Sequence, residues 1–275
     1  MNKRLDFGAF DGHFHLRPDG DAGTVLKRFL RAGGSGINLI CLPDYSLGHQ
    51  SYYERLYEKT IKLGEISRDL GLLTYITLGP YPLDYFFWAE AGKEPLLEMT
   101  RGVDIAAKLC NMDLCNGIGE VGRPHFPVAQ EVIEVCNLVL VRAFETSADL
   151  NVPVILHTED LDPSSMCFLA STAAKSGANL DKVVKHHADP NMNNVCPEMQ
   201  RSILATRPNT RLSISKGIWN FMLESDFVDD PSKPGKVIPE DSVPKRAIMI
   251  KEQYENAEFI MEKIFKEIPD KIFLK

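Results

Sequence analysis

The sequence predicts an α/β fold, a (β/α)8 TIM barrel formed by residues 1–275 as a single domain. Two observations support this prediction. Short β-like runs alternate with helical stretches along the chain, which is typical of βα units on a parallel sheet. In addition, imidazoles or carboxylates stand at the ends of five of these runs. The carboxyl ends of barrel strands surround one opening, so we expect these groups to meet there.

Eight strands are predicted from short apolar runs bounded by turn residues. They cover residues 7–15, 37–43, 72–79, 117–122, 152–158, 182–188, 211–215 and 221–226. Pro153 stands near the start of the fifth strand, one of the few strand positions that tolerate proline. The last two strands are only five residues apart, whereas a helical crossover between parallel strands needs about a dozen residues. Either the seventh helix is shortened or missing, or one strand is misplaced.

Apolar residues three or four positions apart predict helices between these strands. The clearest patterns cover residues 24–32, 52–70, 96–110, 128–150 and 246–265. Two loops would lie on the active face of the barrel: the proline-rich and charged stretch 226–241, and the stretch 81–95 after the third strand. The aromatic residues of 81–95 either pack against the protein or form a wall over the substrate; they are Phe86, Phe87 and Trp88.

The composition is that of a globular protein, with 44% hydrophobic and 25% charged residues. The first ten residues lack the apolar segment of a signal peptide, and no run approaches the ~18 apolar residues of a membrane span. We therefore expect a cytoplasmic protein without membrane contact, and no protein partner is evident. The six cysteines are scattered and are expected to be reduced. The net charge of −7 argues against a large basic surface for duplex DNA.

The first strand ends with two histidines, His13 and His15, whose side chains point to the same face because they are two residues apart. Four further strand ends add imidazoles or carboxylates; these are Glu120, His157, His186 or His187, and Asp226. Four imidazoles and two carboxylates exceed the needs of acid–base chemistry and are a natural ligand set for two divalent ions. The sequence therefore predicts a two-metal hydrolytic centre.

Two of these positions have competitors nearby. Strand alternation sends one of His186 and His187 inward and the other outward, and it does not decide which. Asp226 competes with Asp229 and Asp230, but only Asp226 directly ends an apolar strand.

Five motifs occur in the following order along the chain: Phe-Asp-Gly-His-Phe-His, Gly-Glu-Val-Gly, Ile-Leu-His-Thr, Lys-His-His and Leu-Glu-Ser-Asp. Together they resemble the motifs of the TatD-type metal-dependent hydrolases of the amidohydrolase superfamily. The resemblance spans nearly the whole chain and implies a (β/α)8 barrel with deoxyribonuclease activity. It implies that one metal is held by His13, His15, Glu120 and Asp226, and the second by Glu120, His157 and His186, with Glu120 bridging. His187 is kept in reserve, and Asp226 would also receive a proton from the attacking water.

One departure from the family bears on the substrate. The family usually has Leu-Asp after its Gly-Glu-Ile-Gly motif, whereas Arg123-Pro124-His125 follows here. Arg123 could clamp a phosphate or carboxylate and His125 could serve the leaving group, or both could stabilise the loop. Lys216 is a further candidate for an anionic group, and His49 is a weaker candidate for reaching the substrate. The chain is interpreted as a divergent branch of the family.

The sequence thus predicts a metal-dependent hydrolase with two divalent ions, zinc first and manganese or magnesium next, that lower the pKa of a shared water. Glu120 and Asp226 would carry the catalysis. Three functions stay open. The first is cleavage of a phosphodiester in a single-stranded nucleic acid, and the second is hydrolysis of an amide, ester or lactone in a small molecule. The third, a catalytically silent binding barrel, fits poorly with a complete ligand set.

Overall fold

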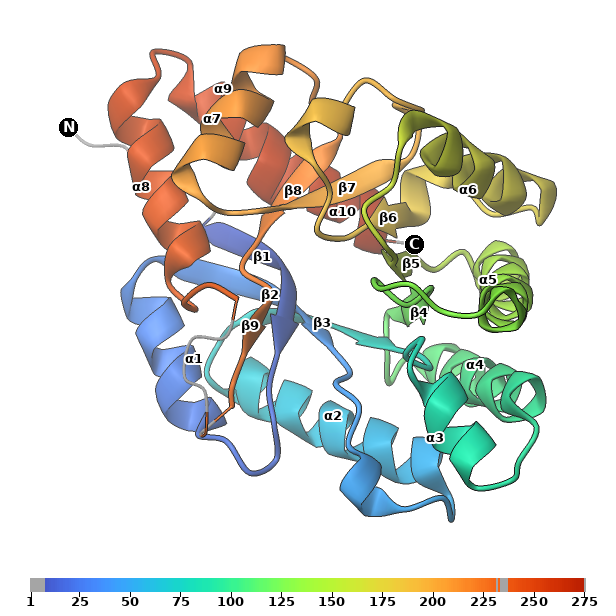
Figure 1. The fold of residues 1–275 in the computed structure, drawn as a ribbon. Coiled ribbons are helices and arrows are strands. Elements are labelled where there is room, and N and C mark those ends of the chain that lie inside the picture. Colours follow the sequence, from blue (N-terminus) through green and yellow to red (C-terminus); the bar gives the residue numbers. More distant parts are fainter. Residues whose placement is uncertain (1–7, 231, 233–236, 275) are drawn as a thin grey trace.

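The computed structural model describes residues 8–230, 232 and 237–274. Within them, nine parallel strands form one sheet in the order β8-β7-β6-β5-β4-β3-β2-β1-β9, with helices between most of the strands (Figure 1). The strands are β1 (Ala9–His15), β2 (Gly34–Ile40), β3 (Leu73–Leu78), β4 (Gly117–Gly122), β5 (Val154–His157), β6 (Val183–Lys185), β7 (Gln200–Leu204), β8 (Phe221–Glu224) and β9 (Phe227–Val228).

The two ends of this sheet meet in one segment of the chain. β8 pairs with β7, whereas β9, which begins only three residues after β8 ends, pairs with β1 through Phe14–Phe227 and His15–Val228. Between β8 and β9, the backbone N–H of Asp226 donates to the carbonyl of His13 at 3.0 Å. The sheet therefore curls round on itself, and the predicted α/β fold of the TIM-barrel type is confirmed.

The helices cover the outside of the sheet (Figure 1). They are α1 (Ala22–Arg31), α2 (Tyr52–Asp69), α3 (Asp84–Glu90), α4 (Pro95–Asn111), α5 (Gln130–Leu150), α6 (Pro163–Lys175), α7 (Arg207–Lys216), α8 (Ser242–Gln253), α9 (Ala257–Glu262) and α10 (Ile268–Phe273). Three short 3₁₀ turns, η1 (Tyr45–Leu47), η2 (Leu180–Lys182) and η3 (Pro190–Met192), and one π-helical turn, η4 (Lys263–Glu267), complete them. None of the helices in the described part of the chain is long and apolar enough to cross a membrane.

The strand predicted at residues 211–215 is wrong, because this stretch belongs to α7. The Thr206 side chain caps the helix by accepting from the N–H of Asn209 at 3.2 Å, and Gly217 ends it in a left-handed conformation. The seventh strand is β7, whose polar Arg201 and Ser202 are fully buried and so hide its strand character in the sequence. A seventh helix is therefore present, and the short spacing came from a misplaced strand.

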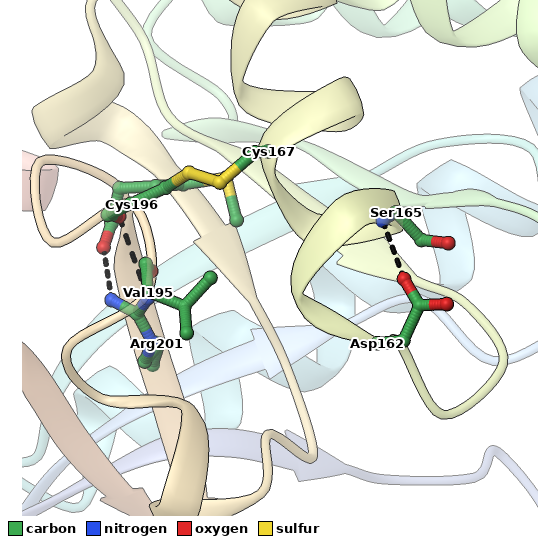
Figure 2. The surroundings of a disulfide bond; sticks show 7 residues. Asp162, Ser165, Cys167, Val195, Cys196 and Arg201 are labelled. Atoms are coloured by element: carbon green, nitrogen blue, oxygen red, sulfur yellow. Dashed lines mark hydrogen bonds between the residues drawn. A yellow bond between two sulfur atoms is a disulfide. The ribbon is translucent and has the colours of Figure 1, made fainter.

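Two cysteines expected to be reduced form a disulfide. Cys167 on α6 is bonded to Cys196 in the loop before β7, with an S–S distance of 1.95 Å (Figure 2). The partners lie 29 residues apart in the sequence, and only the fold brings them together. The other cysteines, Cys41, Cys110, Cys115 and Cys136, are buried and form no disulfide. Because disulfides are typical of oxidising compartments, the cytoplasmic location stays a prediction.

Two aromatic residues of the predicted loop after β3, Phe87 and Trp88, pack against α2. Both belong to α3, in which Trp88 is 1% exposed and donates from Nε1 to the Tyr53 hydroxyl at 3.1 Å. The Phe87 ring contacts Tyr52 of α2, with centroids 4.8 Å apart. Of the predicted loop 226–241, residues 227–228 form β9, and residues 231 and 233–236 lie outside the described residues.

The amino end of the barrel is closed by the last helix, α10. Its Phe273 stacks on Tyr75 of β3 with ring centroids 4.5 Å apart, and it also contacts Phe10 of β1. Burial of these aromatic rings fixes the helix against the strand starts. The carboxyl end of the barrel remains as the face on which a site can form.

Candidate metal centre

Six side chains from five strands or strand ends meet at the carboxyl end of the barrel. His13 and His15 come from β1, Glu120 from β4 and His157 from β5, while His186 directly follows β6 and Asp226 is the second residue after β8. They form three overlapping groups whose ligand atoms lie within 4.8 Å of one another. These are the six residues that the sequence nominated as metal ligands.

The first half-site consists of His13, His15 and Asp226 around one carboxylate oxygen of Glu120. The Nε2 atoms of the two histidines are 3.1 Å apart, and they lie 3.2 and 3.3 Å from Glu120 Oε1. Asp226 Oδ1 is 3.7 Å from His13 Nε2 and 3.5 Å from His15 Nε2. Four donor atoms therefore surround one point.

The second half-site consists of His157 and His186 around the other oxygen of the same carboxylate. His157 Nδ1 is 2.7 Å and His186 Nε2 is 3.4 Å from Glu120 Oε2, and the two ring nitrogens are 3.2 Å apart. Since Oε1 faces the first half-site and Oε2 the second, Glu120 lies between them in the position of a bridging ligand.

The donor set fits divalent metal ions. In each half-site two imidazole nitrogens face each other within 3.2 Å and also face a carboxylate oxygen. Such convergent lone pairs, almost fully buried, are satisfied by a cation better than by one another. Imidazoles mixed with carboxylates suit zinc and manganese.

Glycines on both sides of Glu120 allow β4 to approach β5 closely. A Cβ atom on Gly122 would lie 1.8 Å from the carbonyl oxygen of His157, and one on Gly119 would lie 2.8 Å from that of Ile155. Both glycines also have positive φ angles, 148° at Gly119 and 152° at Gly122, which other residues rarely adopt. The Gly-Glu-Val-Gly motif therefore places Glu120 beside His157.

Groups behind the histidines determine which ring nitrogen faces the site. His15 Nδ1 donates to the carbonyl of Ile40 at 3.0 Å, which leaves Nε2 toward the first half-site. The carboxylate of Glu224 in β8 is fully buried and lies 3.4 Å from His186 Nδ1 and 3.9 Å from His13 Nδ1. Glu224 was missed by sequence reasoning, although its position two residues before Asp226 was a signal for it. Partners of this kind fix the orientation of ligating imidazoles.

The charges in the cluster stabilise one another. Burial raises the pKa of Glu120, but the facing His13 and His186 outweigh burial and hold that pKa well below its usual value. The pKa of Asp226 is also lowered against the effect of burial, chiefly by its hydrogen bond with His15. Burial lowers the pKa of His186 to about 4, whereas hydrogen bonds to Asp226 and Glu120 outweigh burial at His15 and raise its pKa to about 10. Both carboxylates are thus held ionised.

A cavity of about 470 Å³ opens over the cluster, and we call it the metal cavity. It is lined by His15, Arg17, Leu42, Pro43, Tyr81, Leu83, Glu120, His125, His157, His186, Asp226, Val228 and Val237. His157 Nε2 points to this side, 3.0 Å from His125 Nδ1 and 3.3 Å from the Tyr81 hydroxyl. Tyr81 and Arg17 were not nominated from the sequence, although both follow directly after strands that lead to the site.

The two residues predicted to bind substrate lie in different surroundings. His125 lines the metal cavity. Arg123 is 7% exposed and donates from Nε to Asn137 at 2.8 Å and from Nη1 to Glu159 at 3.1 Å. Its guanidinium is thus bonded to neighbouring elements, and Arg123 is absent from the described residues that line the cavity.

The remaining candidates lie away from the cavity lining. His187 is exposed, and its backbone N–H donates to Glu224 at 2.7 Å while the neighbouring His186 faces the cluster. Lys216 is exposed at the end of α7, where the misplaced strand had been expected. His49 lies 3.1 Å from the carbonyl oxygen of Phe87.

Comparison with known sequences finds one family over nearly the whole chain. The profile of the family described as "TatD related DNase" matches residues 10–274. An uncharacterized protein of Methanocaldococcus jannaschii, MJ1127, is 27% identical over 271 residues, which cover 96% of this chain and 94% of that protein.

Solved structures with the same fold include two hydrolase-type barrels. An organophosphorus hydrolase from Deinococcus radiodurans has a TM-score of 0.66 at 14% identity, covering 98% of this chain and 93% of that one. The phosphotriesterase homology protein from Escherichia coli, complexed with phosphate in its active site, has a TM-score of 0.64 at 14% identity and covers 97% and 99%. At these identities the likeness concerns the fold.

Proposed function

Because the chain belongs to the TatD related DNase family, we propose that it cleaves a phosphodiester bond in a single-stranded nucleic acid or at a strand end. Membership of this family makes the protein a metal-dependent hydrolase. The observation that carries the proposal is the placement of Glu120 between two half-sites at the floor of a cavity of about 470 Å³.

The half-sites indicate which residues would hold metal ions. His13, His15 and Asp226 would hold one ion, His157 and His186 the other, and Glu120 would bridge. Zinc suits this donor set best, with manganese or magnesium as alternatives. Bound ions would polarise the scissile group and lower the pKa of a water molecule.

Asp226 is suited to take the proton of the attacking water. Its side chain is 18% exposed and lines the metal cavity, whereas the other carboxylate of the cluster, Glu120, is 5% exposed. The lowered pKa of Asp226 keeps it ionised, so that it can accept. His125 lies on the cavity side of His157, with its Nδ1 3.0 Å from His157 Nε2. It is placed to donate a proton to the leaving group. A direct substrate contact of Arg123 stays a prediction.

The size and charge of the protein favour a single strand over a duplex. The cavity has the volume of a small-molecule site, and it admits one nucleotide-sized group at a time. A net charge of −7 gives little general attraction for a double helix. We therefore expect an unpaired strand or a frayed end to enter this cavity more readily than a duplex.

A second candidate is hydrolysis of an ester or lactone on the same centre. It is favoured by the apolar part of the cavity wall, which is formed by Leu42, Pro43, Leu83, Val228 and Val237. Such a wall would accommodate the alkyl part of a neutral substrate.

The test combines elemental analysis with substrate assays. The purified protein should contain metal and, with added Zn²⁺, Mn²⁺ or Mg²⁺, should degrade end-labelled single-stranded DNA faster than duplex DNA and faster than aryl esters or lactones. Glu120→Gln should abolish cleavage and lower metal content, while Glu131→Gln, an exposed glutamate of α5, should change neither. Turnover of esters or lactones alone would replace the first proposal by the second.

A further inference from the structure

A second cavity adjoins the metal cavity and has no role in the function proposed so far. Its volume is about 340 Å³, and we call it the Arg17 cavity. The two cavities share three lining residues, Arg17, Leu42 and Pro43. A substrate whose reacting group lies over the metal centre can therefore extend past Arg17 into a neighbouring space.

Arg17 is the only arginine or lysine among the described residues that line the metal cavity. Its Nε and Nη2 atoms donate to the two carboxylate oxygens of Asp19 at 2.8 and 2.7 Å, and Nη1 is 3.7 Å from Asp230. The Arg17 and Asp19 side chains are 35% and 61% exposed. Exposed ion pairs contribute little to stability, so an anionic ligand can replace Asp19 on the guanidinium.

The Arg17 cavity has a polar side, where Asp44 pairs with Lys59 at 3.1 Å, and an apolar side that suits a flat group. Leu16, Leu56 and Leu63 are buried beneath it, and Tyr45 forms part of the wall. The Tyr45 hydroxyl donates to the buried Asp84 at 3.0 Å, and its ring stacks on Phe87 at 4.9 Å. The ring is thereby fixed, yet Tyr45 remains 40% exposed. A fixed, half-exposed aromatic ring is a platform on which a nucleobase stacks.

We propose that the Arg17 cavity binds the nucleotide next to the scissile bond, with its phosphate on the guanidinium of Arg17 and its base against Tyr45 and the leucine floor. This proposal rests on the function proposed above, because it identifies the substrate as a strand of at least two nucleotides. It also assigns the binding of an anionic group to Arg17, since Arg123 is bonded to Asn137 and Glu159.

Binding to the purified, metal-loaded protein tests the cavity without any turnover. Thymidine monophosphate, inorganic phosphate, thymidine and glutarate are titrated calorimetrically. The nucleotide should bind tightest, and Arg17→Gln should weaken it about tenfold or more, as expected for loss of a charge-assisted hydrogen bond. Arg142→Gln is the matched control, because Arg142 pairs with Asp104 at 2.7 Å and is 40% exposed. Glutarate binding tighter than the nucleotide, or equal affinity of Arg17→Gln and wild type, would overturn the proposal.

Two variants of Tyr45 test the base contact. Tyr45→Ala should weaken the nucleotide about fivefold or more, because a base loses its stacking partner. Tyr45→Phe keeps the ring and loses only the bond to Asp84, so it should retain most of the affinity. Inorganic phosphate should bind both variants as it binds wild type. An equal loss for nucleotide and phosphate in Tyr45→Ala would contradict a base-stacking role.

Cleavage assays separate failure of this inference from failure of the proposed function. A dinucleotide with a 5′ phosphate should lose more kcat/KM in Arg17→Gln than bis(4-nitrophenyl) phosphate, which has no flanking phosphate. If wild type binds the nucleotide through Arg17 but cleaves no phosphodiester, the proposed activity is wrong and the anion site stands. If wild type cleaves both substrates and Arg17→Gln lowers both equally, the flanking subsite is wrong and the activity stands.

Discussion

The two half-sites of the metal centre contain similar ligands but are held differently. In the first, both histidines come from the single strand β1, and their side chains are 0% and 3% exposed. In the second, His157 ends the short strand β5 and His186 directly follows the short strand β6, and their side chains are 14% and 5% exposed. The two histidines of the first half-site are thus set by the pleat of one strand, whereas those of the second depend on how two neighbouring strands and the loops after them are positioned.

The segments that follow the second half-site are joined covalently. Helix α6 follows His157, and the loop before β7 follows His186. The disulfide Cys167–Cys196 links α6 to this loop. Arg201 strengthens the same loop by donating to the carbonyls of Val195 and Cys196 (Figure 2). We therefore expect the first half-site to be preformed and to bind metal more tightly than the second. Four predictions follow this order, from the largest expected effect to the smallest.

Replacing His13 should affect the whole centre. Its ring is fully buried and stacks on His186 with centroids 4.0 Å apart, so both half-sites lose support. His13→Ala should lower activity by more than the ~10–100-fold that is typical of changes to partners behind a ligand. Metal content by elemental analysis and the rate with saturating Zn²⁺ measure the effect, and the melting temperature controls for folding. A variant with wild-type metal content would remove His13 from the first half-site.

Replacing His157 should remove metal from the second half-site and leave the first one occupied. His157→Ala leaves His13, His15 and Asp226 in place, so the variant should keep the tightly bound metal and lose the other one. Activity should fall strongly, while chelator titration should still show one tight class of metal. Equal loss of both classes would mean that the two half-sites are not independent and that the comparison drawn above fails.

Glu224 should affect the metal affinity of the second half-site more than that of the first, because it lies 3.4 Å from His186 and 3.9 Å from His13. Glu224→Gln keeps the shape of the side chain and removes its charge. We expect metal affinity to fall about 10–100-fold, with the larger loss in the weaker class of metal. Competition with a coloured chelator measures both classes. Unchanged affinities in a folded variant would limit Glu224 to holding the backbone of His187.

The contrast between the two half-sites also explains which ligands could be predicted from the sequence. The pairing of His13 with His15 needs only strand alternation, which is a local property of one segment. The place of His157 and His186 depends on where strands end, and strand alternation does not choose between His186 and His187, so the choice of His186 came from the family resemblance. The convergence of the strand ends was predicted, whereas Glu224 and Arg17 were missed and the Cys167–Cys196 bond between distant segments had no signal in the sequence.

The strand order shows a second limit of sequence reasoning. The stretch 211–215 has the apolar alternation of a strand, but Thr206 and Gly217 cap it as a helix, and capping outweighs a short alternation. β7 was missed because Gln200, Arg201 and Ser202 are polar, although all three are buried in the barrel. Arg201 donates from Nη1 to the carbonyl of Met199 at 2.7 Å and from Nη2 to the carbonyls of Val195 and Cys196 in the loop before the strand. Hydrophobic periodicity carries no signal for such contacts.

Removing the disulfide should have the smallest effect on activity and should act on one half-site. A disulfide whose cysteines are 29 positions apart in the sequence stabilises a protein by about 3 kcal/mol, so Cys167→Ser with Cys196→Ser should lower the free energy of unfolding by this order. The barrel keeps its ligands, but α6 and the loop before β7 can move independently. Metal should leave the second half-site a few-fold faster, while exchange from the first stays unchanged. A phosphine reductant without thiol groups should reproduce the effect in wild type and have none in the double variant. Faster exchange from both half-sites would show that the disulfide supports the whole barrel rather than this part of the centre.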